Sequence, residues 1–363
     1  MLFDPIDVAG LHLRNRIMRS ATHECLASTS GFVTDDLVRV HEELADGGTA
    51  LIVTGYAFVV GWGKATPQQL GIHSDECVSG LARLAEAAKS RGAAACCQIV
   101  HAGRQVFDNV PGARAVCPSA IPDTATEVYP AEITQDEIEE VVGAHAAAAG
   151  RARRAGFDAV QIHCAHGFLL SSFLSPYTNR RHDQWGGPIE NRVRIVLEII
   201  RRTRAVLGSS IALFAKVNSE DALPLGPGIS EEDFVTACRL MAQAGIDMIE
   251  VSGGMAESGA KGAARTGIRH SSEEAYFAKR ARRLKSEIDI PVALVGGLRS
   301  QSVMEELLQS EACDIVSLSR PLICEPALPE KMRTGKATRA RCISCNGCFD
   351  IKGYGCVLPK MAE

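Results

Sequence analysis

The sequence lacks any long apolar run, and it lacks a strong excess of charge of either sign. No apolar stretch approaches the roughly 18 residues that a membrane-spanning helix needs, so we do not expect a membrane protein. The 39 basic and 43 acidic side chains give a net charge of −4, and the Lys and Arg residues are scattered. Such a chain offers no basic surface for nucleic acid or for an anionic membrane, and we expect neither partner.

The N-terminal residues also lack the order of a secretory signal, in which basic, apolar and small residues follow one another. We therefore expect a cytoplasmic protein. In that compartment its 13 cysteines, an odd number, are expected to be thiols or metal ligands rather than disulfides. With 46% apolar and 23% charged residues, the chain can bury a large core.

Short apolar segments alternate with longer segments of helical spacing. Strands are expected at residues 16–20, 50–54, 94–100, 159–163, 213–217, 248–252, 292–295 and 315–318. Helices are expected at residues 35–46, 76–91, 136–155, 189–207, 231–244, 272–286, 300–309 and 328–334. No G-x-G-x-x-G motif follows the first strand, which argues against a Rossmann domain. This alternation predicts an α/β protein, a parallel (β/α)8 TIM barrel over residues 1–335.

Two segments fall outside the repeat. Residues 107–130, rich in Pro, Ala and Thr, are expected to cap the barrel mouth, and residues 336–363 form a short Cys-rich C-terminal tail. The tail holds a C-x2-C-x2-C-x7-C pattern made by Cys342, Cys345, Cys348 and Cys356. Clustered thiolates suit tetrahedral zinc or an iron–sulfur cluster, and the spacing is closer to that of a [4Fe–4S] cluster. A vacant or degenerate site is the alternative, because spacing alone does not show occupancy.

In a (β/α)8 barrel the functional residues lie at the carboxyl ends of the strands and in the loops that follow. In strand order, these positions hold Ser20, Ala21, Thr22 and His23; Gly55 and Tyr56; Gln98 and His101; His163 and His166; Lys216; Ser252, Gly253 and Gly254; Gly296 and Gly297; and Ser319 and Arg320.

The last two strands suggest an anion site. Backbone N–H groups at Gly296 and Gly297 can approach a phosphate, and Arg320 supplies charge. Two tight turns and a surface arginine are the alternative. Lys216 ends an apolar strand, where a cation needs a carboxylate or an electron-rich ligand. An ion pair with the nearby Glu220 or Asp221 would satisfy it.

His163 and His166 lie three residues apart after the fourth strand, so both can reach the barrel mouth. A histidine pair can bind zinc, act as acid and base, or donate hydrogen bonds to a carbonyl oxygen. Zinc would need a third ligand at the same mouth, and a purely structural pair is a further alternative.

Several motifs are familiar in combination. They are Asn15-Arg16-Ile17, Gln98-Ile-Val-His101-Ala-Gly-Arg104, Gly156-Phe-Asp-Ala-Val-Gln-Ile-His163-Cys-Ala-His166-Gly167, Phe173-Leu-Ser-Pro176, Asn179, Arg181, Asp183, Gly186-Gly187, Glu190-Asn191-Arg192 and Ser319-Arg320-Pro321. From Leu2 to about Glu325 the sequence resembles the old yellow enzyme family of FMN-dependent NAD(P)H:flavin oxidoreductases. Within it, the branch that contains 2,4-dienoyl-CoA reductase is the most similar.

The resemblance implies a role for each strand end. The segment from Ser20 through Ala21 and Thr22 to His23 would lie along the flavin, Gly55 would leave room beside its ring, and Gln98 would bond the pyrimidine edge. Lys216 stands where most members carry arginine, and its charge would stabilise anionic reduced flavin. The ribityl chain and phosphate would be held by Ser252, Gly253, Gly254, Gly296, Gly297, Ser319 and Arg320. His163 and His166 would grip a carbonyl oxygen of the small-molecule substrate and polarise a conjugated C=C bond for hydride transfer.

The sequence departs from the family pattern at Phe168, where members usually carry the tyrosine that donates a proton to the α-carbon. A phenyl ring has no proton to give. The candidates for the proton donor are therefore His23, Tyr56, Tyr177 and water. The alternative is a reaction that needs no proton at the α-carbon.

The tail also departs from the dienoyl-CoA reductase pattern. Its third and fourth cysteines come earlier, and the sequence ends at Glu363, where those enzymes continue into an FAD- and NAD(P)H-binding half. We therefore expect a bound cluster to exchange electrons with a separate electron-transfer protein; without a cluster, NAD(P)H would reduce FMN directly.

The main expectation is thus an FMN-dependent enzyme that reduces an activated C=C bond. The rivals are a flavin/iron–sulfur electron-transfer subunit and a zinc-dependent hydrolase built on His163 and His166. A homo-oligomer is compatible with the sequence.

Overall fold

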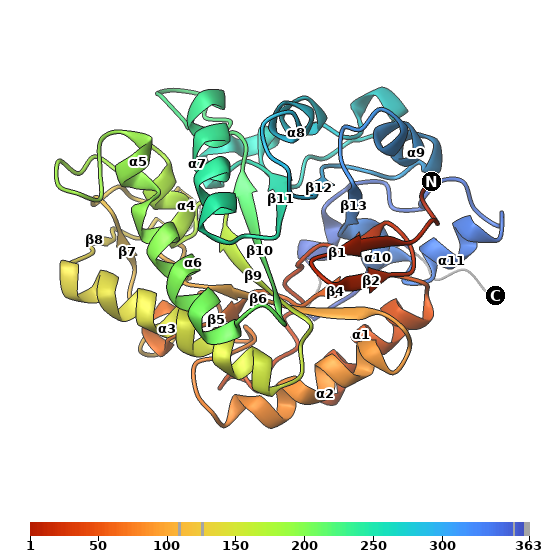
Figure 1. The fold of residues 1–363 in the computed structure, drawn as a ribbon, viewed down its shortest axis with the longest axis horizontal. Coiled ribbons are helices and arrows are strands. Elements are labelled where there is room, and N and C mark those ends of the chain that lie inside the picture. Colours follow the sequence, from red (N-terminus) through yellow and green to blue (C-terminus); the bar gives the residue numbers. More distant parts are fainter. Residues whose placement is uncertain (108–109, 125–126, 351–352, 359–363) are drawn as a thin grey trace.

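A closed barrel of parallel strands, surrounded by helices, forms the centre of the molecule (Figure 1). This computed structural model describes residues 1–107, 110–124, 127–350 and 353–358. Around the barrel the strands are β3 (Ile17–Arg19), β4 (Leu51–Val53), β6 (Ala94–Val100), β9 (Ala159–Cys164), β10 (Ala212–Asn218), β11 (Met248–Ser252), β12 (Val292–Val295) and β13 (Ile315–Leu318). The ring closes where β13 pairs with β3 and β4 pairs with β6. The predicted (β/α)8 TIM barrel is therefore confirmed.

Helices cover the outside of the barrel. The longer ones are α1 (Asp35–Asp46), α2 (Cys77–Lys89), α3 (Gln135–Arg154), α6 (Arg194–Leu207), α7 (Glu231–Ala244), α8 (Ala278–Lys285) and α9 (Gln301–Gln309). Shorter helices are α4 (Leu169–Leu174), α5 (Ile189–Arg192), α10 (Arg320–Cys324) and α11 (Leu328–Arg333), with 3-10 turns at Gly61–Gly63, Ala256–Lys261, Ser271–Glu273 and Gly347–Phe349. None of the described helices is long and apolar enough to cross a membrane.

Two predicted helices differ from the structure. The predicted helix 189–207 consists of α5 and α6, which meet at Val193. The predicted helix 272–286 begins only at Ala278, because Ala275 adopts a left-handed conformation (φ 55°) that interrupts helical geometry.

Small strands add to the barrel. β1 (Ile6–Val8) and β2 (Leu11–Leu13) form an antiparallel hairpin, and β5 (Ala57–Phe58) pairs with β6. β7 (Val116–Cys117) and β8 (Ala131–Glu132) pair with each other. The described part of segment 107–130 thus contains β7. Its Ala113 and Ala115 pack in one apolar cluster with Phe168 and Tyr56, which places the segment beside the mouth. That it caps the mouth stays a prediction.

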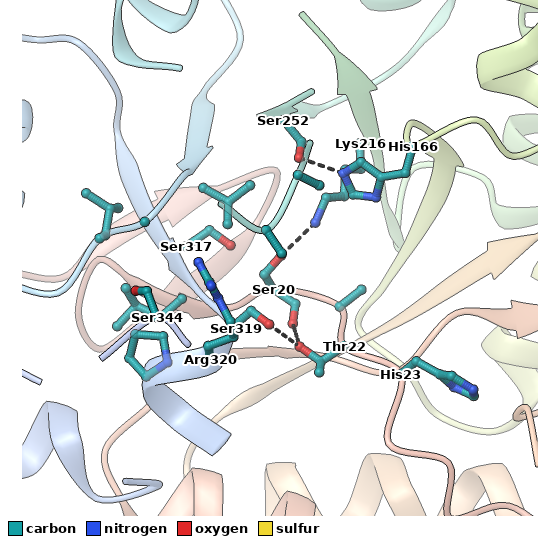
Figure 2. A pocket seen from close by; sticks show the side chains of 18 of the residues that line it. Ser20, Thr22, His23, His166, Lys216, Ser252, Ser317, Ser319, Arg320 and Ser344 are labelled. Carbon is teal, nitrogen blue, oxygen red and sulfur yellow. Dashed lines mark hydrogen bonds between the residues drawn. The ribbon is translucent and has the colours of Figure 1, made fainter. Parts of the chain in front are cut away.

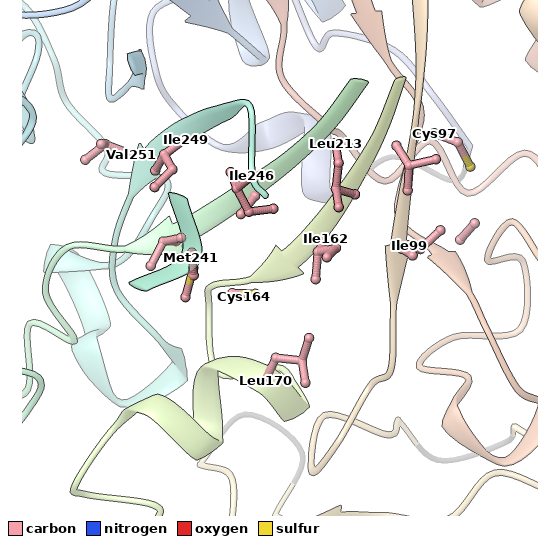
Figure 3. Close-up of a cluster of buried hydrophobic side chains, with 14 of the residues drawn as sticks. Cys97, Ile99, Ile162, Cys164, Leu170, Leu213, Met241, Ile246, Ile249 and Val251 are labelled. Atoms are coloured by element: carbon pink, nitrogen blue, oxygen red, sulfur yellow. The ribbon is translucent and has the colours of Figure 1, made fainter. Parts of the chain in front are cut away.

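Each barrel strand is buried on both faces, and alternate side chains belong to different cores. On β10, Leu213, Ala215 and Val217 join the outer core between strands and helices, part of which Figure 3 shows. Ala212 and Phe214 join a second cluster inside the barrel. Inside it they meet Met18, Leu51, Cys96 and Met248 from other strands, and Val8 and Leu13 from the β1–β2 hairpin. This period of two fixes which residues of each strand face the barrel interior.

Candidate functional site

Toward the carboxyl ends of the strands, the inward-facing positions change from apolar to polar. They are occupied by Gln98, Gln161, Lys216, Glu250 and Ser317, all at most 3% exposed. In the strand register Lys216 lies opposite Glu250, and Gln98 lies opposite Gln161. Because β6, β9, β10, β11 and β13 each contribute one such side chain, the barrel gains a polar floor beneath its mouth.

Hydrogen bonds link this floor into one network. Lys216 Nζ donates to Ser20 Oγ at 2.7 Å and lies 3.2 Å from Glu250 Oε1. Ser20 and Ser317 also donate to Glu250 Oε1, and Gln161 Nε2 donates to Oε2 at 3.0 Å. Glu250, on the neighbouring strand, is thus the carboxylate that pairs with Lys216.

The alternative considered for Lys216, an ion pair with Glu220 or Asp221, is therefore wrong. Glu220 pairs with Arg265 at 2.9 Å, and Asp221 accepts hydrogen bonds from Asn218 and from the backbone of Ile229. Both acidic residues belong to the loop that follows β10, whereas the Lys216 side chain points into the barrel.

A cavity of about 240 Å³ lies above this floor. Figure 2 shows side chains from several strand ends converging on it. Among the predicted site residues, its lining includes Ser20, Ala21, Thr22, His23, Tyr56, His166, Lys216, Ser252, Gly297, Ser319 and Arg320. The structure thus brings together residues from seven of the eight barrel strand ends.

The remaining predicted residues lie behind this lining. Gln98 and His163 are buried in the adjacent wall, at 1% and 2% exposure. At Gly55 an added Cβ would lie 2.2 Å from Glu24 Oε2, so this glycine leaves room for that carboxylate. Gly253, Gly254 and Gly296 lie where the backbone or an aromatic ring of another segment comes close. A Cβ added at Gly254, for example, would lie 2.7 Å from the Cα atom of Gly262.

One end of the cavity is cationic. Arg320 follows β13 and donates to the backbone oxygen of Arg265 at 2.9 Å and to Asn346 Oδ1 at 2.6 Å. Arg299, which follows Gly297, also lines the cavity and is 7% exposed. Two guanidinium groups beside a glycine turn suit an anionic group such as a phosphate.

The histidine pair lies at the other end. The rings of His163 and His166 are 5.2 Å apart in an edge arrangement, and His166 Nε2 lies 2.7 Å from Ser252 Oγ. Burial, assisted by the charge of Lys216, lowers the pKa of His166 to about 3. Burial, followed by the neighbouring His166 and Lys216 groups, holds the pKa of His163 well below its usual range. Both imidazoles are therefore neutral at pH 7, and each carries one N–H that can donate a hydrogen bond.

Aromatic side chains surround the pair. Phe168 packs 4.8 Å from the His163 ring and 5.1 Å from Tyr56, and Tyr56 lies 4.9 Å from His23. His23 Nε2 is 2.8 Å from Thr66 Oγ1, and burial lowers the pKa of His23 to about 4. Tyr177 packs instead against Arg180, outside the lining of this cavity.

A second cavity of about 520 Å³ adjoins the first. Thr22, His23, Tyr56 and Phe349 line both cavities. The other walls of the second come from the barrel and from the tail: Cys25, Thr66, Gln105, Phe107, Ile323, Cys348, Gly353, Tyr354 and Gly355. The tail therefore shapes the entrance to the barrel mouth.

The tail cysteines differ in their surroundings. Cys342 is buried, Cys348 and Cys356 are half-buried, and Cys345 is exposed. Burial and the neighbouring Cys356 thiol raise the pKa of Cys324, a residue outside the predicted set, to about 12. Within the described parts of the chain, no three His, Cys, Asp or Glu side chains are grouped as ligands of one metal ion. The metal role of Cys342, Cys345, Cys348 and Cys356 therefore stays a prediction, and no third ligand joins His163 and His166.

Four residues of the site were missed in the sequence: Gln161, Glu250, Ser317 and Arg299. A signal for the first three exists, because each is a polar residue at an inward position of an otherwise apolar strand. Arg299 gave no comparable signal, since it lies in the loop after the Gly296-Gly297 pair.

Comparison with known proteins shows which families and structures are similar to this chain. The family model described as "NADH:flavin oxidoreductase / NADH oxidase family" matches residues 1–339. An NADPH dehydrogenase of Geobacillus sp. (strain WCH70) is 36% identical over 91% of this chain and 92% of its own length. A metal reductase of Desulforamulus reducens is 35% identical over 100% of this chain but only 54% of its own length.

A solved structure of a 2-naphthoyl-CoA reductase in complex with 2-naphthoyl-CoA superimposes with a TM-score of 0.87 at 28% identity. That match covers 93% of this chain and 53% of the neighbour. The chain thus spans about half the length of the metal reductase and of this neighbour.

Proposed function

Because the chain belongs to the NADH:flavin oxidoreductase / NADH oxidase family, we propose that it binds FMN at the barrel mouth and uses NAD(P)H to reduce an activated C=C bond. The acceptor is a carbonyl or acyl-thioester compound. One observation carries the proposal: a single cavity joins a cationic end at Arg320 to a neutral histidine at His166. That arrangement suits a phosphorylated cofactor whose reactive end meets a carbonyl substrate.

The residues present fit FMN. Gln98 Oε1 and His163 Nδ1 are buried and have no hydrogen-bond partner among the described residues. Buried polar atoms are normally paired, so these two atoms are suited to a ligand. We assign the phosphate to Arg320, Ser319 and Gly297. The polar ring edge is assigned to Gln98 and Lys216.

When bound, FMN supplies hydride chemistry, accepting a hydride from NAD(P)H and passing it to the acceptor. The chain's own residues bind and orient the cofactor and the substrate. Neutral His163 and His166 can donate N–H groups to the substrate's carbonyl oxygen, which draws electron density from the conjugated bond. Lys216, held by Ser20 and Glu250, keeps a positive charge fixed on the cavity floor.

The acyl-thioester option has one specific support. The 2-naphthoyl-CoA reductase neighbour is named for an aromatic acyl-CoA ligand and superimposes on 93% of this chain. The simple carbonyl option is supported by the NADPH dehydrogenase relative, which matches this chain over nearly its whole length.

An alternative function is a flavin/iron–sulfur electron-transfer subunit that works with a partner protein. It is favoured by the metal reductase relative, which is 35% identical over the whole of this chain, including the Cys-rich tail. In this reading the barrel, residues 1–335, holds FMN, and the cysteines of the tail, residues 336–363, hold a [4Fe–4S] cluster that relays electrons to the partner.

The visible spectrum of the anaerobically purified protein tests both readings, recorded before and after denaturation and with the iron content. Flavin bands alone, with NAD(P)H-dependent reduction of 2-cyclohexenone, are the expected result. Flavin bands with a broad iron-dependent shoulder would favour the electron-transfer subunit. A colourless protein that does not take up added FMN would overturn the proposal.

A further inference from the structure

We propose that the hydroxyl group of Tyr56 donates the proton that Phe168 cannot give, so that it protonates the α-carbon of the substrate. This inference rests on the proposed reduction of a C=C bond. Tyr56 follows β4, and its ring lies among those of Phe168 at 5.1 Å, His23 at 4.9 Å and His163 at 6.2 Å. The side chain therefore stands beside the residues assigned to the substrate.

Tyr56 also lines both cavities, so it lies where they meet. Within the described residues, nothing accepts a hydrogen bond from its hydroxyl or donates one to it. The oxygen is also not among the buried polar atoms that lack a partner, so it is accessible from the cavity. An unengaged phenol hydroxyl at the wall of a substrate cavity is free to meet a reacting carbon.

The other four tyrosines are engaged or lie outside the two cavities: Tyr276 lines the first cavity and Tyr354 the second, and the hydroxyl groups of both are hydrogen-bonded. Tyr276 donates to the Ala263 oxygen at 2.7 Å, and Tyr354 accepts a hydrogen bond from Arg19 at 3.1 Å. Tyr129 is 83% exposed, and Tyr177 packs against Arg180. Among the five tyrosines, Tyr56 thus combines a place at the cavity wall with a hydroxyl that no described residue engages.

The histidines are less suited to this role. His23 is engaged with Thr66 and His166 with Ser252, and the pKa values of about 4 and about 3 leave almost no imidazolium at pH 7. Burial and the nearby Cys25 and Glu24 groups raise the pKa of Tyr56 above its ordinary value. Its hydroxyl therefore remains protonated throughout the neutral range and can act as a general acid.

The step balances with NAD(P)H as the source of the hydride, as in the proposed function, and with solvent as the final source of the proton. A hydride joins the β-carbon, the electron pair of the C=C bond forms a new C–H bond at the α-carbon, and the Tyr56 O–H bond breaks. The phenolate is then reprotonated from solvent through the second cavity, which borders Tyr56.

The test uses Tyr56→Phe, with Tyr177→Phe as the matched control, because both changes remove one hydroxyl. The substrate is 2-methylcyclohex-2-enone, whose reduction creates a stereocentre at the α-carbon. Tyr56→Phe is expected to lower kcat by about 100-fold or more and to reduce the enantiomeric excess of the product, since water would protonate either face. Tyr177→Phe should match the parent, and Tyr56→Phe combined with Phe168→Tyr should recover at least tenfold in rate.

A second readout does not depend on turnover. The protein is labelled with 3-fluorotyrosine, and the fluorine resonance that is missing from the spectrum of Tyr56→Phe is assigned to Tyr56. Cyclohexanone should shift this resonance and leave the Tyr177 resonance in place. Unchanged rate and enantiomeric excess in Tyr56→Phe, or no shift of its resonance with bound cyclohexanone, would overturn the inference. A parent protein that binds no FMN or reduces no enone would instead overturn the proposed function.

Discussion

Lys216 and Glu250 form a buried ion pair across two neighbouring strands, with Nζ and Oε1 3.2 Å apart and both side chains at most 4% exposed. Three further donors, from Ser20, Ser317 and Gln161, satisfy the same carboxylate. A buried charge is tolerated only when it is paired and hydrogen-bonded, and this one is. The pair therefore fixes a positive charge beneath the cavity before any ligand enters.

Removing the negatively charged partner, Glu250, should lower the stability of the protein. Glu250→Gln keeps the size of the side chain but leaves Lys216 buried without a counter-charge, so we expect the free energy of unfolding to fall by about 3 to 5 kcal/mol. Urea denaturation measures it. The control is Glu198→Gln, which breaks an exposed pair with Arg201 on α6 and should change stability little. A loss no larger than that of the control would show that the Lys216 charge is not dependent on Glu250.

The barrel could be predicted because its strands are buried on both faces and read as short apolar runs. The predicted bounds 248–252 and 292–295 match β11 and β12, where such runs end sharply. The β1–β2 hairpin was missed because its strands of three residues are too short to show a period.

The partner of Lys216 was also missed, for a different reason. Residues near in sequence, Glu220 and Asp221, seemed sufficient, whereas the strand register brings Glu250 opposite Lys216. Register is set by the three-dimensional pairing of strands, and one sequence alone does not display it. The functional strand ends, by contrast, follow directly from the fold class.

His163 is expected to bind ligand without holding the cofactor's phosphate. His163→Ala should weaken binding of a phenol or enone by about tenfold, the equivalent of one lost hydrogen bond of about 1.4 kcal/mol, while FMN stays bound. Titration of the flavin absorbance with 4-hydroxybenzaldehyde measures the affinity. His12→Ala, an exposed change beside Asp7, is the control. Full retention of affinity in His163→Ala would contradict the assigned role.

Arg320 is expected to bind the phosphate group of FMN. Arg320→Met should weaken FMN binding by about tenfold or more, because a charge-assisted hydrogen bond is worth about 1.5 to 3 kcal/mol. Riboflavin lacks the phosphate and serves as the control ligand, whose affinity should change little. Equal losses for FMN and riboflavin would show instead that the variant disturbs the cavity, since Arg320 also bonds Asn346 in the tail.

The buried histidines should make the protein sensitive to acid. His145 on α3 is fully buried, with Nδ1 2.8 Å from the Val141 oxygen, and burial lowers its pKa to about 4. Its unfolded pKa is about 6.5, so between these values the unfolded chain binds the extra proton. The stability that His145 contributes is therefore present above pH 6.5 and is lost as the pH falls toward 4.

This single group should change the free energy of unfolding by about 3 kcal/mol across that window. His145→Gln removes the titrating group, so the stability difference between parent and variant should shrink by this amount from pH 7 to pH 4. Urea denaturation at a series of pH values measures it, with the exposed His12→Gln as the control. A difference that is independent of pH would show that His145 binds its proton as readily in the folded protein as in the unfolded chain.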